Sequence, residues 1–205
     1  MTRDIPSRML REAIAQAAAR MIAEDGLHDY GLAKRKAAKM LGASERQQLP
    51  NNDEIEAAVR AYREVFQTDS HPDLLRELLG IAVEVMGQMQ RYRPQLTGSV
   101  LNGTAGPESD VNLLLYADSD KDVEIDLLNR GIPFEPGERK RTLRGEVRRV
   151  PVLSVFVDDT VVNLEVLEPR DRNDRPRQNG HRAERADIEA VRALLDALDD
   201  SADPT

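Results

Sequence analysis

The sequence has no cysteine, no tryptophan and few aromatic residues, and each shortage argues against a class of site. Without cysteine, neither a disulfide nor a thiolate-bound metal can contribute. The three histidines, His28, His71 and His181, are far apart, so their spacing matches no zinc site. Aromatic residues make up only 3% of the chain, which argues against the base-stacking platforms of single-strand binders.

Long hydrophobic runs are also missing. No apolar stretch approaches the roughly 20 residues that span a bilayer, and the first ten residues, MTRDIPSRML, lack the apolar segment of a secretory signal. The net charge of -8 argues against non-specific attraction to nucleic acid or anionic membrane. We therefore expect a soluble cytoplasmic protein without a membrane partner.

Apolar residues in the first half recur at steps of three and four, which is typical of amphipathic helices. This spacing predicts helices over residues 7–24 and 32–41, a third helix capped by Asn52 or Asp53, and a fourth starting at His71. The predicted organisation begins with a helical N-terminal domain over residues 1–91.

The pattern changes after Pro94. Segments rich in β-branched residues predict strands over residues 110–116, 150–157 and 160–167, with a helix over 120–130 after the first strand and a closing helix over 184–198. We expect a second domain over residues 92–198 and a disordered tail over 199–205. The predicted fold class is α+β, with helices first and a mixed sheet flanked by helices after them.

The segment LTGSVLNGTAGPESDVNLLLY, residues 96–116, is the part of the sequence most informative about chemistry. A Gly-Ser pair at a helix start, here Gly98 and Ser99, lets backbone amides and a hydroxyl approach a phosphate closely. Asp110 and Asn112 are two residues apart on a predicted strand, so they share one face. Acidic side chains at that spacing hold Mg²⁺ ions that bridge nucleotide phosphates.

The segment GSVLNGTAGPESDVN has a Gly-Ser pair, then Gly103, then Asp110 at the start of a strand. In this order of residues it resembles the signature of the polymerase β-type nucleotidyltransferase superfamily, and especially its small bacterial minimal members. The resemblance covers residues 96–167. It implies a nucleotidyltransferase-like fold and Mg²⁺-dependent transfer of a nucleoside monophosphate from a nucleoside triphosphate to a hydroxyl group. The acceptor would be a protein, an RNA or a small molecule.

The resemblance also implies roles for individual residues. Gly98, Ser99 and Gly103 match the nucleotide-binding segment, and Asp110 matches the first metal carboxylate. Asn112 stands where the family has its second carboxylate. The third belongs on the strand over residues 160–167, where Asn163 is favoured by hairpin register and Glu165 shares its face. The expected metal ligands are thus Asp110, Asn112 and Glu165, with Asn163 as a neutral auxiliary ligand.

The two asparagines leave a second hypothesis open. An amide oxygen can bind Mg²⁺ but carries no charge, so it neutralises a triphosphate–metal complex less well. The alternative is a pseudo-enzyme that binds a nucleotide or a partner through the same cleft.

Two basic stretches have both functional and structural interpretations. Six arginines between residues 170 and 185 could contact phosphates or RNA, or form a solvated loop. Arginines and a lysine over residues 139–149 could share one face of a strand, or protect an edge strand over 142–150 from aggregation.

The N-terminal segment over residues 17–42 is similar in cadence to the first helices of TetR-type DNA-binding domains, and its second predicted helix is basic. A Pro/Asn-containing loop and then an acidic helix follow, where a recognition helix should stand. This argues against specific DNA binding, so a DNA-binding regulator is kept only as a third, minor hypothesis, and a helical accessory domain is the preferred interpretation.

Overall fold

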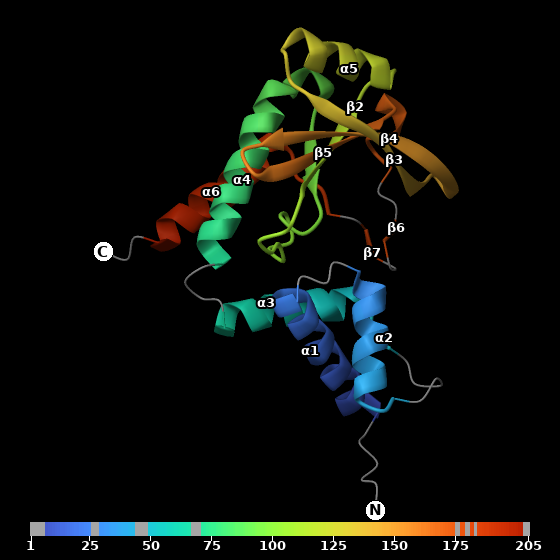
Figure 1. Ribbon diagram of the computed structural model, residues 1–205, viewed down its shortest axis with the longest axis vertical. Coiled ribbons are helices and arrows are strands. Elements are labelled where there is room, and N and C mark those ends of the chain that lie inside the picture. The colour runs from blue at the N-terminus through green and yellow to red at the C-terminus, as the bar shows by residue number, and fades with distance from the viewer. Residues whose placement is uncertain are drawn as a thin grey trace, which may run out of the picture. The chain divides into compact units, whose positions relative to one another are not determined.

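The computed structural model describes residues 7–25, 29–43, 49–66, 71–174, 177–178, 181–182 and 184–202. The chain divides into two compact units. We call the first the helical unit, which comprises Met1–His71 with Gly106–Glu108, and the second the sheet unit, which comprises Pro72–Ala105 with Ser109–Thr205. Figure 1 shows the elements of both.

The helical unit contains α1 (Ser7–Asp25), α2 (Tyr30–Met40) and α3 (Asn52–Phe66). Helix α1 packs against both α2 and α3. The core combines branched side chains with alanines, which let the helices approach closely; it includes Leu10, Ile14, Ala18, Ala33, Ala37, Ile55 and Val59.

A capping box begins α3. Asn51 Oδ1 accepts a hydrogen bond from the Glu54 amide at 2.8 Å, and the Asn51 amide donates to Glu54 Oε2 at 2.7 Å. The predicted cap, Asn52 or Asp53, was therefore wrong by one or two positions. The reciprocal bond needs an acid three residues after the cap, and Asn51 forms it with Glu54.

The sheet unit contains four helices or strands before its long hairpins: α4 (His71–Gln88), β1 (Gln95–Thr97), β2 (Val111–Tyr116) and α5 (Asp120–Asn129). Then come β3 (Phe134–Leu143), β4 (Glu146–Val157), β5 (Thr160–Leu167) and α6 (Ile188–Ala202). Short 3₁₀ helices lie at Gln90–Tyr92 and Pro169–Asp171, and a two-stranded ribbon is formed by β6 (Arg177–Gln178) and β7 (His181–Arg182).

The five-stranded sheet has the order β1-β2-β5-β4-β3. Strands β2 and β5 are parallel, and the other neighbouring pairs are antiparallel. The sheet is therefore mixed, and the expected α+β class, with helices first and a helix-flanked mixed sheet after them, is confirmed.

One face of the sheet forms the main core with α4 and α5 (Figure 1). Leu113, Leu115 and Leu164 project from the strands into this core, and Met86 and Val123 reach it from the two helices. Side chains alternate along a strand, so Asn112, Asn163 and Glu165 project from the opposite face. Helices α4 and α5 thus cover one face of the sheet, and the opposite face carries these polar side chains.

Helix α4 belongs to the sheet unit, so the expected domain boundary after residue 91 lies inside that unit. Leu78, Leu79 and Met86 bury the apolar face of α4 in the same core as the strands. A helical pattern identifies the helix and its apolar face, but it does not identify the partner against which that face packs.

Two further boundaries differ from the sequence prediction. The tail prediction was wrong for residues 199–202, which form the last turn of α6, and residues 203–205 lie outside the described residues. The edge strand expected over 142–150 is instead β3, which ends at Leu143 before a turn at Arg144 and Gly145. Pro136 and Gly137 concealed β3, since both residues are unfavourable in strands.

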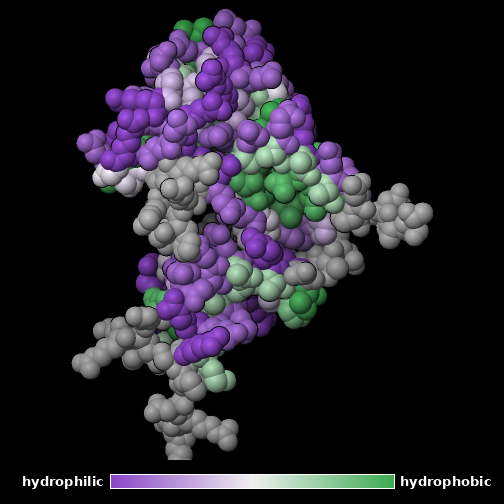
Figure 2. All heavy atoms as spheres, turned by 180° about the vertical axis from the view of Figure 1, so that it is seen from behind, coloured by the Kyte–Doolittle hydropathy of each residue, from purple (hydrophilic) through white to green (hydrophobic). Residues whose placement is uncertain are grey.

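Hydrophobic side chains also gather at the surface of the sheet unit. Figure 2 shows them on the side where α4 and α6 lie. Leu74 and Val83 of α4, and Leu195 and Leu198 of α6, are partly buried there against the main core. Just before α6, Ala186 exchanges backbone hydrogen bonds of 2.8 and 3.0 Å with Leu96 of β1, which ties the helix to the sheet edge. No helix in the described part of the chain is long and apolar enough to cross a membrane.

Candidate functional site

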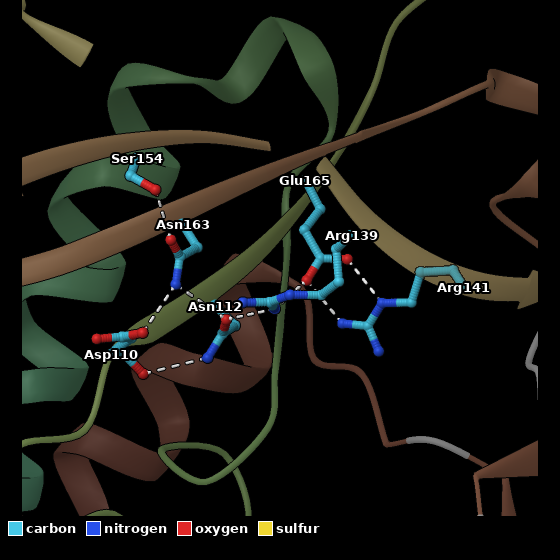
Figure 3. A network of polar contacts seen from close by, with 7 residues as sticks. All are labelled: Asp110, Asn112, Arg139, Arg141, Ser154, Asn163 and Glu165. Atoms are coloured by element: carbon cyan, nitrogen blue, oxygen red, sulfur yellow. Dashed lines mark hydrogen bonds and ion pairs between the residues drawn. The ribbon is translucent and has the colours of Figure 1, made fainter. Parts of the chain in front are cut away.

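The register of the central strands brings the predicted site residues together. Asn112 of β2 pairs with Asn163 of β5, and Leu114 pairs with Glu165. Ser154 of β4 pairs with Asn163 from the other side. These pairings place Asp110, Asn112, Asn163 and Glu165 in one polar cluster on the open face of the sheet (Figure 3).

Asn163 lies at the centre of this cluster, with only 5% of its surface exposed. Its Nδ2 donates to Asp110 Oδ2 at 3.0 Å and to Asn112 Oδ1 at 3.3 Å. Its Oδ1 accepts a hydrogen bond from Ser154 Oγ at 2.8 Å. Asn163 therefore points a hydrogen-bond donor at the Asp110 carboxylate, whereas a metal ligand would have to present oxygen.

Glu165 is fully buried, and both of its carboxylate oxygens accept hydrogen bonds from arginine. Arg141 binds it in a forked arrangement, with Nε 2.7 Å from Oε2 and Nη2 2.6 Å from Oε1. Arg139 Nη1 donates to Oε1 at 2.5 Å. The pKa of Arg141 is raised above its ordinary value, chiefly by these hydrogen bonds to Glu165. Glu165, expected as a metal ligand, is instead the acceptor of two guanidinium groups.

Arg139 also joins Glu165 to the amide pair. Its Nη1 donates to Asn112 Oδ1 at 3.0 Å as well as to Glu165, so this one nitrogen lies between oxygens of β2 and β5 (Figure 3). The Arg139 side chain is 40% exposed. A positive charge therefore stands inside the cluster and can be reached from the open face.

The predicted phosphate segment forms a tight turn after β1. The amide of Asn102 donates to the Gly98 carbonyl at 3.0 Å, and that of Thr104 donates to the Ser99 carbonyl at 2.8 Å. Gly98 has a φ of +85°, and a Cβ there would lie 3.6 Å from Asn112 Nδ2. The turn that holds Gly98, Ser99 and Gly103 thus adjoins the polar cluster at Asn112.

The residues do not fit the two-magnesium site that the family resemblance implies. Such a site needs several charged oxygen ligands, and here Asp110 is accompanied by two neutral amides and an arginine. The described residues contain no group of three or more His, Cys, Asp or Glu side chains that could hold a metal ion. The guanidinium groups of Arg139 and Arg141 both pair with Glu165, and the Asp110 carboxylate accepts a hydrogen bond from the neutral Asn163 amide.

Sequence reasoning placed Arg139 and Arg141 in a basic stretch without assigning them to the site, and it did not consider Ser154. The available signal was the spacing of two between the arginines. The Arg144-Gly145 pair that follows them, with φ of 52° and 84°, is a hairpin turn that folds β3 back along β4. If residues before this turn are read as a strand that pairs with the apolar strand after it, Arg139 and Arg141 fall on the same face of the sheet, because they are two residues apart.

The second arginine-rich run, residues 170–185, has mainly structural contacts where it is described. Arg170 pairs with Glu168, and Arg185 Nη1 donates to the Tyr116 hydroxyl at 3.1 Å. Asp171, which is fully buried, is bound by Arg148 at 2.6 Å. Arg175 and the side chains of Arg177 and Arg182 lie outside the described residues.

Comparisons with known proteins add little to this geometry. The sequence matches no protein-family model and no curated protein. A solved structure of a cytoplasmic RNA terminal U-transferase aligns with 51% of this chain and 29% of that chain, at 17% sequence identity and a TM-score of 0.26. Similarity at that level carries no argument about activity.

Proposed function

We propose that this chain is a nucleotidyltransferase-like protein that binds a nucleoside phosphate on the polar face of its sheet without performing metal-dependent nucleotidyl transfer. The observation that carries the proposal is the place of Arg139, whose Nη1 bridges Asn112 and Glu165 where the family resemblance calls for metal ligands. The Gly-Ser turn beside Asn112 is not a helix start, and it supports phosphate binding only because glycine lets a ligand approach the backbone closely.

The donor set argues against the metal-dependent reaction. Transfer of a nucleoside monophosphate uses two metal ions that neutralise the triphosphate and align the attacking hydroxyl. Asn112 and Asn163 carry no charge to hold such ions, and Asn163 turns its amino group toward Asp110. Glu165 has both oxygens engaged by arginine, so it is not free to serve as the missing carboxylate.

The same cluster is suited to an anion. A guanidinium group binds phosphate oxygens in a forked geometry, and such charge-assisted hydrogen bonds are roughly twice as strong as neutral ones. Arg139 offers its charge on the open face, and Gly98 at the start of the turn lies next to Asn112. A triphosphate lying between the turn and Arg139 would meet the guanidinium group on one side and the glycine backbone on the other.

A thermal-shift screen with the four ribonucleoside triphosphates, each with EDTA or with Mg²⁺, tests the proposal. A triphosphate at 100 times its dissociation constant should stabilise the fold by about 2.7 kcal/mol. We expect at least one triphosphate to raise the melting temperature in EDTA, and Asp110→Ala to keep that shift because it removes a negative charge near the phosphates. Absence of a shift with every triphosphate would contradict nucleotide binding.

Turnover separates this proposal from the enzymatic alternative. Labelled triphosphates incubated with the protein, RNA and Mg²⁺ or Mn²⁺ should give no labelled product and no pyrophosphate above the Asp110→Ala background. Metal-dependent turnover that Asp110→Ala abolishes would instead establish transfer to a protein, RNA or small-molecule hydroxyl.

A further inference from the structure

Burying the Glu165 carboxylate requires a compensating cation. An ionised carboxylate away from water is strongly disfavoured unless it is paired and hydrogen-bonded. Glu165 is fully buried between the polar cluster and a small apolar group on the same face, which is formed by Leu114, Tyr116, Leu143, Val150 and Leu167. Arg141 satisfies one side of this carboxylate with two hydrogen bonds.

Arg139 has a different place from Arg141. Its Nη1 lies 2.5 Å from Glu165 Oε1 and 3.0 Å from Asn112 Oδ1. These oxygens come from two parallel, neighbouring strands, and Asn112 Oδ1 is also bound by Asn163. The nitrogen of Arg139 thus stands between oxygen ligands in the position that a bound cation would take.

We propose that the Arg139 guanidinium is a built-in cation that replaces a divalent metal in this site and excludes metal ions from it. It deepens the proposed function, because a phosphate ligand would then be bound by Arg139 directly and without metal. The exclusion of metal itself does not depend on any nucleotide.

Charge and space both support the exclusion. A divalent ion placed between the same oxygens would meet the positive charge of Arg139 at close range, and repulsion between such groups is costly where water is scarce. The two carboxylates and two guanidinium groups of the cluster already cancel, which leaves little net negative charge to attract an ion. Arg139 is also held in place by β3, whose backbone at Arg139 pairs with Val150 of β4.

Binding of Mn²⁺, followed by electron paramagnetic resonance on the full chain without nucleotide, tests this inference. The first variant, Asn112→Asp with Asn163→Asp, restores carboxylates at both amide positions. The second adds Arg139→Ala to this pair. The matched control adds Arg149→Ala instead, because Arg149 is an exposed arginine whose ion pair is with Glu138, outside the cluster.

We expect no saturable Mn²⁺ binding by the unchanged protein, and weak binding by the double variant and by the Arg149→Ala control. The variant that also lacks Arg139 should bind Mn²⁺ at least about tenfold more tightly than either. If Arg139→Ala prevents folding, as judged by circular dichroism, Arg139→Gln takes its place, since glutamine keeps a hydrogen-bond donor without charge. Arg139→Lys in the same background should bind Mn²⁺ no more tightly than the double variant, because lysine keeps the positive charge.

Three results would overturn the inference: Mn²⁺ binding by the unchanged protein that Asp110→Ala removes, equal affinity with and without Arg139, or no binding by a folded variant that lacks it. Nucleotide binding can fail separately. If no triphosphate binds but the Mn²⁺ affinities follow the expected order, the proposed function is wrong and the built-in cation remains.

Discussion

Glu165 shows how one residue can determine the character of a site. A carboxylate on this strand face matches the family pattern for a metal ligand. In the structure, however, the Glu165 carboxylate forms ion pairs with Arg139 and Arg141. The sequence placed Asp110 and Asn112 on one strand and Asn163 and Glu165 on a later one, because alternation along a strand is a local property. Only the family resemblance joined the two strands in one site. It did not show that two arginines of β3 reach Glu165, because that contact depends on a strand hidden by Pro136 and Gly137.

Removing Glu165 should destabilise the sheet unit strongly. Glu165→Ala leaves two guanidinium groups without their buried partner, and breaking a buried ion pair costs about 3 kcal/mol or more. Glu168→Ala is the control, because Glu168 is half-exposed and its pairs with Arg148 and Arg170 lie near solvent; its loss should cost less than about 1 kcal/mol. Urea unfolding measures both, and equal losses would contradict the role of Glu165.

Tyr116 gives a prediction for alkaline pH. Burial raises the pKa of its hydroxyl above the ordinary value, and this hydroxyl donates to Gln95 Oε1 at 2.7 Å. The unfolded state therefore loses this proton first, so the stabilising effect is complete below the ordinary tyrosine pKa of about 10 and is lost as pH rises toward the folded pKa. Melting temperatures measured from neutral to alkaline pH should fall more steeply for the unchanged protein than for Tyr116→Phe. Parallel curves would contradict the effect.

At the scale of elements, the sequence predicted those with strong periodicity. The expected strand over residues 160–167 coincides with β5, and the fourth helix starts at His71 as expected. Caps and edges were harder, as Asn51 and β3 show, because a cap depends on side-chain geometry and an edge strand has little hydrophobic pattern.

The β3–β4 hairpin should depend on glycine at its turn. Gly145 has a φ of +84°, where a side chain is strained, so Gly145→Ala should destabilise the sheet unit by about 1 kcal/mol. Gly80 within α4 is the opposite case, because a Cβ there would meet no atom within 4 Å and alanine favours the helix. Gly80→Ala should stabilise by up to about 1 kcal/mol. Thermal unfolding of the two variants should show shifts of opposite sign, and shifts of the same sign would contradict this account.

At the scale of the whole molecule, the chain divides into two compact units, and the candidate site lies entirely in the sheet unit. The helical unit is built around Ile14 and Ile55, and the sheet unit around residues such as Leu113 and Leu164. The sequence analysis assigned α4 to the helical part, because helices of a core and of a separate domain share one periodicity.

Calorimetry of the full chain should therefore resolve two transitions. Asn51→Ala breaks the capping box of α3 and should lower the free energy of unfolding of the helical unit by about 1 kcal/mol. The temperature of only one transition should therefore fall. Glu165→Ala should lower the other, and a bound triphosphate should raise that same transition. A single transition moved by both substitutions would contradict independent units.

Titration calorimetry of the best-binding triphosphate, with EDTA and then with Mg²⁺, tests the central claim most directly. Arg139 supplies the positive charge that a metal would bring, so we expect the same dissociation constant in both buffers and loss of binding in Arg139→Ala but not in Arg149→Ala. Binding that appears only with Mg²⁺ would contradict the account, and would show that Asp110 and its asparagine neighbours hold a metal after all.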